Sequence, residues 1–384
     1  MHSTRYLIVG GGMTGAAAVK GIREHDPDGP IALVGAEPDA PYKRPPLTKG
    51  LWSGGDEAKI WLGTADRGVD LTLGRRIVAL DLETRRATDD EGGEYAWEKL
   101  LLATGGAPRT IEGAEGVVYY RTLADYRRVR AQAVEGARFV VIGGGFIGSE
   151  IAAALTGAGC RVTMVFPESG IASRLLPDEL STFVTGYYRD KGVEVFSGET
   201  VAGVDAAGVH TGSGRVLEAD GVIAGLGIVP QTDLASAGGL PVDNGIVVDE
   251  YGRVGGRDHI FAAGDVANFP APALGRRFRV EHEDHANTHG AVVGANMTGR
   301  EIPYDHLPFF YSDMFDLGYE AVGEVDARLA TIARWEEPNR KGIVAYVDES
   351  RRPRGFLLWN TWDKVDAARD LIRAAQPIDE AMLV

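Results

Sequence analysis

Two glycine-rich segments of this sequence have the residue types and the spacing of nucleotide-binding turns. The glycines recur at a constant offset, as Gly10, Gly12 and Gly15 and again as Gly143, Gly145 and Gly148. In such a turn the first glycine permits a tight bend, the second lets the backbone approach a pyrophosphate, and the third lets a helix pack on a strand. Unpaired N–H groups at the helix N-terminus then face the phosphates. One copy is weak evidence, but two copies predict two dinucleotide-binding sites.

The elements needed to position these glycines are visible in the sequence pattern. Apolar, partly β-branched runs predict buried parallel strands, and they cover residues 6–9, 31–34, 139–142 and 161–166. Helix-forming residues follow each glycine turn, and the second helix is expected from Ser149 to about Thr156. Because each turn lies between a strand and a helix, we expect an α/β protein with two doubly wound, Rossmann-like domains.

An acidic residue about 20 positions after the third glycine should bind the ribose hydroxyls of a dinucleotide. Glu37 and Glu168 have this spacing. Neither lies directly at a strand end, so a solvent-facing loop carboxylate is the alternative for each. Glu168 would repel a 2′-phosphate on the ribose, whereas the nearby Arg174 could tolerate one.

Further strand patterns extend over the rest of the chain. Strands are expected at residues 76–80, 99–103, 221–226 and 260–263, with a polar turn at 89–94. The tail has strand candidates at residues 319–325, 342–347 and 355–359, and a last helix from about Asp363 to Ala375. This tail predicts a small α+β domain.

The composition limits the class of protein. At 384 residues the chain exceeds one usual hydrophobic core, so two or three domains are expected. A formal net charge of −15 argues against a general nucleic-acid or anionic-membrane binder. The arginine clusters at 276–279 and 351–354 are interpreted as solvated surface, with a local basic patch as the alternative. No apolar run has the about 18 residues of a membrane span. The first strand is expected to begin by Tyr6, which leaves no room for a signal peptide, so a cytoplasmic location is expected.

The chain resembles the FAD-dependent pyridine nucleotide-disulfide oxidoreductase-like family, whose members carry two dinucleotide folds. The resemblance covers essentially the whole chain, and its specific segments are Pro41–Lys49, Leu102–Gly105, Gly143–Glu150 and Ala263–Asp265. The pattern is most similar to the branch of ferredoxin reductases and apoptosis-inducing factor. The segments similar to apoptosis-inducing factor are Phe166–Glu168, Val280–Ala286, Leu317–Gly323 and Leu358–Asn360.

The resemblance implies a domain plan and two cofactors. Residues 1–110 and 235–300 would form a discontinuous FAD-binding domain, residues 111–234 an inserted NAD(H)-binding domain, and residues 301–384 the C-terminal domain. FAD and NADH are the implied cofactors, with NADPH as an alternative, and no metal site is expected. Besides the fingerprint glycines, the residues expected to hold the cofactors are Met13, Thr14, Glu37, Arg44, Lys49, Ala103, Thr104, Gly105, Phe146, Ile147, Glu150, Glu168, Arg174, Gly227, Gly264, Asp265, Glu281 and His282.

Several of these residues have a second interpretation. By resemblance, Asp265 binds the flavin ribityl chain ahead of a helix N-terminus, although an aspartate there could simply cap that helix. Phe146 would lie at the flavin–nicotinamide contact or pack in a core. Tyr311 stands where the family often has a tryptophan near the nicotinamide. His282 would lie near the flavin ring or begin a helix, and with His285 it has too few partners for a metal site.

The residues expected to act in catalysis are Lys49, Glu150, Phe146, Tyr311 and His282. The resemblance places Arg44 toward the dinucleotide and Lys49 against the isoalloxazine, where a cation would stabilise the negative charge that develops on the flavin. A shielded cation needs a partner, and Glu150, expected in the first turn of the second fingerprint helix, is the available one. The helix dipole alone is the alternative reason for a carboxylate at Glu150.

The cysteine count bears on how electrons leave the protein. Cys160 is the one cysteine, so the chain lacks the redox thiol pair of related disulfide reductases, and Cys160 is interpreted as an inert packing residue. Hydride is therefore expected to pass from nicotinamide to flavin, and electrons to pass on to a ferredoxin- or rubredoxin-like protein or a quinone-like molecule. The alternative is redox sensing like that of apoptosis-inducing factor, in which a long-lived reduced flavin–NAD complex controls assembly. A homodimer is a candidate assembly, and nucleic-acid or membrane partners are not expected.

Overall fold

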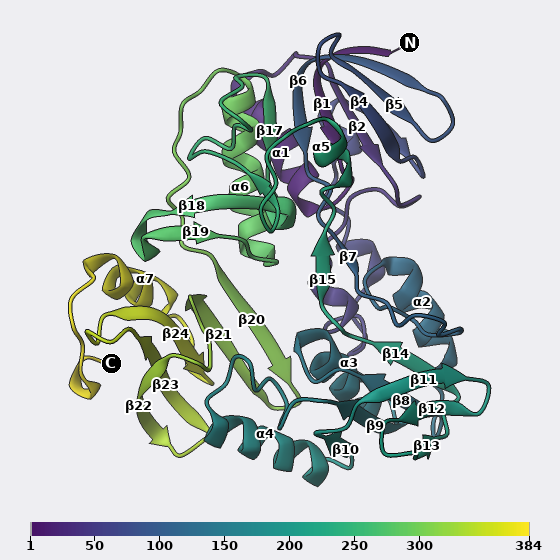
Figure 1. The fold of residues 1–384 in the computed structure, drawn as a ribbon, viewed down its shortest axis with the longest axis vertical. Helices are drawn as coiled ribbons and strands as arrows, with labels where there is room; N and C mark the ends of the chain where they lie inside the picture. The colour runs from purple at the N-terminus through teal and green to yellow at the C-terminus, as the bar shows by residue number, and fades with distance from the viewer. Residues whose placement is uncertain (1, 384) are drawn as a thin grey trace. The chain divides into compact units, whose positions relative to one another are not determined.

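The computed structural model describes residues 2–383. By its internal contacts the chain divides into two compact units, whose elements can be followed by label and colour in Figure 1. The first unit comprises the chain up to Arg44, Asp56–Ala107 and Val229–Pro308. The second comprises Pro45–Gly55, Pro108–Ile228 and the chain from Phe309 onward. The expected division into three domains remains a prediction.

The first unit is built on a seven-stranded sheet. Its strands are β1 (His2–Val9), β2 (Ile31–Gly35), β3 (Val69–Leu73), β4 (Ile77–Asp81), β5 (Arg86–Asp89), β6 (Glu94–Leu102) and β17 (Ile260–Ala262). The order is β3-β2-β1-β6-β5-β4, and β17 pairs with the last part of β6, beyond the stretch that β5 covers. β1 is parallel to both β2 and β6, so the strand order reverses at β1. In such sheets the ligand crevice lies at the carboxyl end of the strand where the order reverses.

Two helices pack closely together in the core of this unit. They are α1 (Met13–His25) and α6 (Glu283–Met297). A Cβ on Gly21 would lie 2.0 Å from the carbonyl oxygen of Ala291, and one on Gly294 would lie 2.2 Å from that of Ala18. Larger residues at these two positions would therefore force the helices apart. The surrounding buried core includes Ile8, Val19, Ile22, Leu33, Leu101, Phe261 and Val293.

Shorter elements complete the first unit. A small sheet has the order β16 (Ile246–Val247), β18 (Ala267–Ala271), β19 (Arg276–Phe278). Helix α5 spans Asp233–Ala237, and the 3-10 helices are η2 (Glu57–Lys59), η3 (Ala65–Arg67), η4 (Gly264–Val266) and η5 (Pro272–Leu274). The strands β7 (Gly106–Pro108) and β15 (Ile228–Pro230) form a two-stranded sheet where the chain passes from one unit to the other.

The second unit contains a four-stranded parallel sheet with the order β10-β9-β8-β14. Its strands are β8 (Arg138–Ile142), β9 (Arg161–Phe166), β10 (Glu194–Ser197) and β14 (Gly221–Ala224), and its helices are α2 (Leu123–Gln132), α3 (Phe146–Gly157) and α4 (Asp178–Asp190). A separate antiparallel sheet comprises β11 (Val201–Asp205), β12 (Gly208–Thr211) and β13 (Val216–Leu217). The order of the parallel sheet reverses at β8, as it does at β1 in the first unit.

The tail forms a five-stranded antiparallel sheet with the order β20-β21-β24-β23-β22. Its elements are β20 (Phe309–Met314), β21 (Leu317–Gly323), β22 (Ala330–Glu337), β23 (Lys341–Val347), β24 (Pro353–Trp359), α7 (Val365–Ala374) and η6 (Glu380–Met382). In Figure 1 this sheet is drawn in yellow-green, and α7 packs against β21 and β24. The 3-10 helix η1 (Pro45–Leu47) also belongs to the second unit.

The expected fold class is confirmed, with corrections at element boundaries. The first strand begins at His2, well before the apolar run, and the strand expected at 99–103 is longer, beginning at Glu94. Helix α3 begins at Phe146 rather than Ser149, since the variable residues of the glycine turn are already helical. In the tail, the sequence pattern does not predict strands β20 and β22. β22 is an edge strand with largely exposed residues, so it has no continuous apolar run to mark it.

Candidate functional site

The first glycine turn follows β1 and requires glycine at two of its positions. Gly10 has a φ of +127°, and a Cβ there would lie 2.1 Å from the carbonyl oxygen of Ala103. A Cβ on Gly15 would lie 2.2 Å from the carbonyl oxygen of Gly10. The first glycine therefore allows the bend beside the end of β6, and the third allows α1 to approach β1, as expected from the sequence.

The second turn repeats this geometry after β8. Gly143 has a φ of +114°, and its Cβ would lie 2.4 Å from the carbonyl oxygen of Gly225. A Cβ on Gly148 would lie 2.0 Å from the carbonyl oxygen of Gly143. The sequence repeat is therefore also a repeat of structure.

The middle glycines have the opposite environment. Gly12 and Gly145 are the N-cap residues of α1 and α3, and neither helix has a side-chain capping bond. A Cβ on either glycine would meet no atom within 4 Å among the described residues. The same is true of Gly227, which has a φ of +80°. An open, bare backbone at a helix N-terminus is what a pyrophosphate requires, so both turns fit a dinucleotide.

Gly264 lies against the first turn of α1, and Asp265 follows it in the chain. Gly264 has a φ of +73°, and a Cβ there would lie 2.1 Å from Oγ1 of Thr14. Asp265 lies inside η4, whose N-cap is Ala263 and which leads into β18. The expectation of a helix after Asp265 is therefore wrong, and so is the alternative that Asp265 caps one. Its binding of the ribityl chain remains a prediction.

The residues after β6 stabilise the same region. Thr104 Oγ1 donates a hydrogen bond of 2.7 Å to the carbonyl oxygen of Gln231, and Gly105 has a φ of +63°. Ala103, with its carbonyl oxygen against Gly10, is buried. These contacts hold the Ala103–Gly105 segment beside the first glycine turn.

Glu37 is engaged by the chain itself. It lies in the loop after β2, where Arg44 donates to Oε1 and the Tyr42 hydroxyl donates to Oε2 at 2.5 Å. Burial disfavours the charge on Arg44, but Tyr42, Glu37 and Asp265 outweigh it and raise the pKa of the guanidinium. The backbone N–H of Arg44 donates to Met13 Sδ at 3.5 Å. The loop is thus fixed to α1, and binding of ribose by Glu37 remains a prediction.

Arg279 contacts Asp265 and Glu281, although the sequence does not predict it as a site residue. Its guanidinium donates to the carbonyl oxygen of Asp265 at 3.1 Å and to Glu281 Oε1 at 2.8 Å. Its side chain is only 12% exposed, so the interpretation of the cluster at 276–279 as solvated surface is wrong for this residue. The neighbouring Arg277 is also held, by Oδ1 and the carbonyl oxygen of Asn268. Nothing in the pattern of a short arginine run distinguishes these inward positions.

Glu150 is the centre of a hydrogen-bond network in the second unit. Its side chain is 5% exposed, and Lys49 Nζ lies 2.6 Å from Oε1. Ser312 Oγ donates to the same oxygen at 2.7 Å, and Thr48 Oγ1 donates to Oε2 at 2.5 Å. The predicted ion pair of Lys49 and Glu150 is therefore present, and every oxygen of the buried carboxylate has a donor.

The expectation that Glu150 lies in the first helical turn is wrong. Because α3 begins at Phe146, Glu150 is its fifth residue, and the first turn holds no acidic side chain. Helix-dipole effects fall off within the first turn, so the dipole is a poor explanation for this carboxylate. The ion pair and the two hydroxyl donors explain its burial better.

Aromatic side chains adjoin the network. The Lys49 ammonium lies 4.9 Å from the centre of the Tyr311 ring, within reach of a cation–π contact. Phe146 meets Phe310 edge to face, with ring centres 5.2 Å apart, yet it is 40% exposed, and its neighbour Ile147 is exposed as well. Phe146 is therefore not a core residue, and its contact with a nicotinamide remains a prediction.

Glu168 follows β9 in the second unit and forms an ion pair with Arg174. The distance from Arg174 Nη2 to Glu168 Oε1 is 2.6 Å, and the Arg174 side chain is 87% exposed. An ion pair with so exposed a partner contributes little to stability. Binding of a ribose hydroxyl by Glu168 remains a prediction.

His282 is the N-cap residue of α6, as the helix-start interpretation requires. Burial lowers its pKa to about 4, against the opposing effect of Asp284, so the ring is neutral at pH 7. In the described part of the chain, no three His, Cys, Asp or Glu side chains are arranged to hold a metal ion. A role for His282 near the flavin remains a prediction.

Cys160 is buried directly before β9, with Sγ 3.6 Å from the carbonyl oxygen of Val134. Burial raises the pKa of its thiol, and Arg130 opposes the rise only in part. A thiol with a raised pKa is a weak nucleophile at neutral pH. This environment agrees with an inert packing residue.

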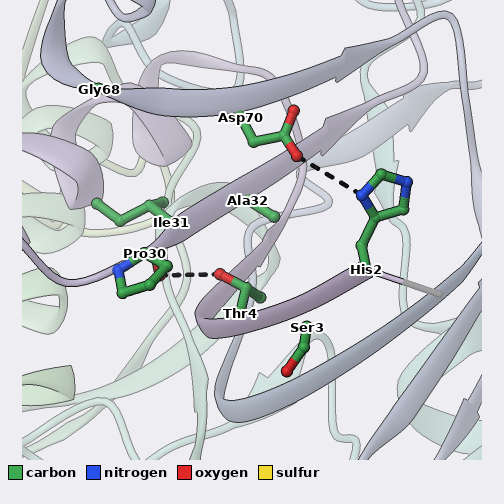
Figure 2. A pocket seen from close by; sticks show the side chains of 8 residues that line it. All are labelled: His2, Ser3, Thr4, Pro30, Ile31, Ala32, Gly68 and Asp70. Carbon is green, nitrogen blue, oxygen red and sulfur yellow. Dashed lines mark hydrogen bonds and ion pairs between the residues drawn. The ribbon is translucent and has the colours of Figure 1, made fainter.

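A separate pocket of about 220 Å³, shown in Figure 2, lies at the amino-terminal ends of β1, β2 and β3. His2 and Asp70, which line it, are 3.8 Å apart and both well exposed. An ion pair between two exposed side chains contributes little free energy. Ligands of doubly wound sheets bind at the opposite, carboxyl ends of the strands. We therefore assign the functional site to the glycine turns.

Among residues 2–383, no helix has the length and apolarity needed to cross a membrane.

Comparison with known proteins agrees with this geometry. Residues 4–301 match the profile of pyridine nucleotide-disulphide oxidoreductases, and residues 293–339 match that of the C-terminal region of mitochondrion-associated apoptosis-inducing factor. The mitochondrial apoptosis-inducing factor 1 of Dictyostelium discoideum is 31% identical over 98% of this chain and 79% of its own length. The ferredoxin–NAD(+) reductase component of the anthranilate 1,2-dioxygenase system of Burkholderia cepacia is 35% identical over 100% of this chain and 97% of its own length.

The solved structures agree with the sequence relatives. A chain in the crystal structure of the covalent putidaredoxin reductase–putidaredoxin complex superposes with a TM-score of 0.92 and 29% identity, over 100% of this chain and 96% of that one. The chain therefore belongs to the pyridine nucleotide-disulphide oxidoreductase family, as an FAD-containing oxidoreductase that uses a nicotinamide coenzyme.

Proposed function

We propose that this protein is an NADH-dependent reductase that delivers electrons to a small iron–sulfur protein of the ferredoxin class. The observation that carries the proposal is the match, over nearly the full length of both chains, to a ferredoxin–NAD(+) reductase component. The superposition on a chain crystallised as a reductase–putidaredoxin complex supports the same class of partner. With one buried cysteine, the chain offers no thiol pair to receive the electrons, so an external acceptor is needed.

The two glycine turns would divide the cofactors between them. The first turn, with Ala103–Gly105, Gly264 and Asp265, would hold FAD, and the N-terminus of α1 would face its pyrophosphate. The second turn would hold the nicotinamide coenzyme at the N-terminus of α3. When bound, FAD supplies the chemistry, accepting hydride from the nicotinamide and passing electrons on singly or in pairs.

The chain's own contribution near the flavin ring would come from Lys49. A fixed ammonium there would stabilise negative charge as it develops, because it is already oriented and poorly hydrated. Glu150 would hold the ammonium in place at 2.6 Å, and Thr48 and Ser312 would hold Glu150. The Tyr311 ring would limit the movement of Lys49 from another side.

We propose NADH as the preferred coenzyme. Glu168 would accept from the ribose 2′-hydroxyl and would repel the 2′-phosphate of NADPH. Arg174 is paired with Glu168 and would not by itself create a phosphate site. We also propose a cytoplasmic location for the protein and a homodimeric assembly. Sedimentation velocity of the purified protein tests whether it is a dimer.

An acceptor panel tests the proposal. The holoprotein is supplied with NADH and, in separate reactions, a [2Fe–2S] ferredoxin, a rubredoxin, a soluble quinone and oxygen. The proposal predicts fast multiple turnovers with the ferredoxin, at least about tenfold above oxygen. Turnover that is equally slow with every acceptor would contradict it.

A redox-sensing role is the second candidate, and the match of residues 293–339 to the C-terminal region of apoptosis-inducing factor favours it. Such a protein would be reduced slowly and would keep a charge-transfer complex of reduced flavin and NAD that air discharges slowly. The absorbance of that complex, followed together with the sedimentation coefficient, distinguishes the two candidates. A long-lived band that accompanies a change of assembly would favour sensing over the reductase.

A further inference from the structure

Buried histidine and aromatic side chains pack near the Gly264–Val266 turn of the first unit. His285 and His289 project from α6, and both are 0% exposed. His289 stacks on Tyr304 with ring centres 4.4 Å apart, and His285 stacks on Phe269 at 4.6 Å. The two imidazoles are themselves 4.8 Å apart. Neither histidine has a part in the proposed transfer of electrons.

His289 is bonded to the backbone that presents Asp265. The N–H of Gly264 donates to His289 Nδ1 at 3.3 Å. A neutral imidazole has one acceptor nitrogen and one N–H, so His289 carries its proton on Nε2. Gly264 is also the residue whose Cα faces Thr14 in the first turn of α1. The contact therefore connects α6 to the turn and, through it, to the N-terminus of α1.

We infer that His289 is a positioning residue of the FAD cradle, whose neutral imidazole accepts the Gly264 N–H and holds the turn that carries Asp265. The inference rests on FAD being held at the first glycine turn. In a protein without this acceptor, the Gly264 N–H would be buried and unpaired, and the turn would relax away from the conformation that binds FAD. His289 would act through the backbone of this turn, by its contact with the Gly264 N–H.

Protonation would reverse the contact. A second proton, on Nδ1, would turn the acceptor into a donor that faces the Gly264 N–H, and it would place a charge in an apolar site. Burial lowers the pKa of His289 to about 3 and that of His285 well below its ordinary range. Besides each other, the titratable groups around the two histidines are Tyr304, His282, His306 and Asp284, of which the last two are paired at 2.6 Å.

The sign of the pH dependence follows from these values. When the turn is closed, the pKa of His289 is about 3, and when it is open the pKa returns toward 6.5. Between these values the open form binds more protons, so acid favours it. The contribution of His289 to FAD retention is thus complete above pH 6.5 and is lost as the pH falls toward 3. For each proton taken up on opening, the equilibrium constant for FAD release rises by up to about tenfold for each pH unit of acidification.

Release of FAD from the holoprotein, followed by flavin fluorescence from pH 8 to pH 5, tests the inference. His289→Asn places an amide oxygen near the position of Nδ1 and cannot gain a proton. His289→Leu removes the acceptor at similar volume, and His25→Asn changes an exposed histidine at the end of α1 as the control. At pH 8 we expect the Leu variant to bind FAD about five- to a hundredfold more weakly, the range for an unpaired buried donor. The Asn variant should retain FAD within about threefold of wild type.

The pH profile supplies the second readout. We expect the acid limb of FAD release to be shallower in His289→Asn by about one proton, because His282 and His285 still titrate, whereas His25→Asn follows wild type. Equal FAD retention by wild type and the Leu variant at pH 8, or an unchanged acid limb in the Asn variant, would overturn the inference. Wild-type protein that holds no FAD at pH 8 would instead contradict the proposed function.

Discussion

Lys49 Nζ and Glu150 Oε1 lie 2.6 Å apart, although 101 positions separate the two residues in the chain. Ser312, from β20, donates to the same carboxylate oxygen, and Thr48 donates to the other. Three distant stretches of sequence thus meet at one buried carboxylate. The charge of Glu150 is paired with Lys49, and both of its oxygens accept hydrogen bonds. The Lys49 ammonium can therefore stay buried in one position.

Loss of either partner should change flavin reduction without loss of FAD. Glu150→Ala frees Lys49 to move, so we expect reduction by NADH to slow by about tenfold, equivalent to about 1.4 kcal/mol of transition-state stabilisation. Lys49→Ala should lower the flavin reduction potential and slow reduction as well. Reductive titration and single-turnover kinetics on both variants and the double variant provide the test. Strictly additive effects would show that the two residues act independently.

The hydroxyl donors should act through Glu150. Thr48→Val and Ser312→Ala each leave one carboxylate oxygen with fewer donors, and we expect slowing by about three- to tenfold, the net worth of a typical intramolecular hydrogen bond. Thr48→Ser keeps the hydroxyl and should restore the wild-type rate. Ser53→Ala removes an exposed hydroxyl from the same loop and is the matched control. If flavin reduction by NADH is as fast in Thr48→Val as in Thr48→Ser, the Thr48 hydroxyl has no role in the reaction.

Coenzyme choice should depend on Glu168. Wild-type protein is expected to be reduced faster by NADH than by NADPH, and Glu168→Ala should narrow the ratio by about tenfold, the worth of one charge-assisted contact. Glu115→Ala, at an exposed position of the same unit, should leave the ratio unchanged. Flavin bleaching with each coenzyme in turn gives the ratio. A tenfold advantage for NADPH in the wild-type protein would overturn the assignment.

Cys160 should be dispensable for electron transfer. Its thiol is buried with a raised pKa, so a water-soluble disulfide reagent at pH 8 should modify it slowly in the folded protein and quickly in urea. Cys160→Ala should retain the rates of flavin reduction and acceptor turnover within about twofold, at a modest loss of stability from lost packing. A variant reduced normally but unable to pass electrons on would show that the thiol takes part.

The local parts of the site are readable from the sequence. Glycine turns depend on residue type at fixed spacing, and both appear as expected, with the first and third glycines closely packed and the second open. The meeting of Lys49 with Glu150 was expected from a family resemblance, since no local pattern connects positions in separate segments.

The remainder depends on packing that a single sequence does not display. Arg279 belongs to a run of arginines, and only the fold directs it inward to Asp265 and Glu281. His289 lies in an unremarkable helical stretch, and its role depends on the approach of Gly264. Phe146 and Ile147 resemble loop positions of the fingerprint, so the sequence predicts a later start for α3 and a first-turn position for Glu150. Both predictions differ from the structure.

The transfer of electrons from NADH through the flavin to a ferredoxin can be measured by anaerobic rapid mixing of the holoprotein with NADH, followed by a second mixing with a [2Fe–2S] ferredoxin. We expect a yellow protein with noncovalent FAD, fast bleaching of the flavin by NADH, and rapid return of its absorbance as the ferredoxin is reduced through repeated turnovers. A protein that holds no flavin and takes up none when FAD is added, or a reduced flavin that the ferredoxin does not reoxidise, would contradict it.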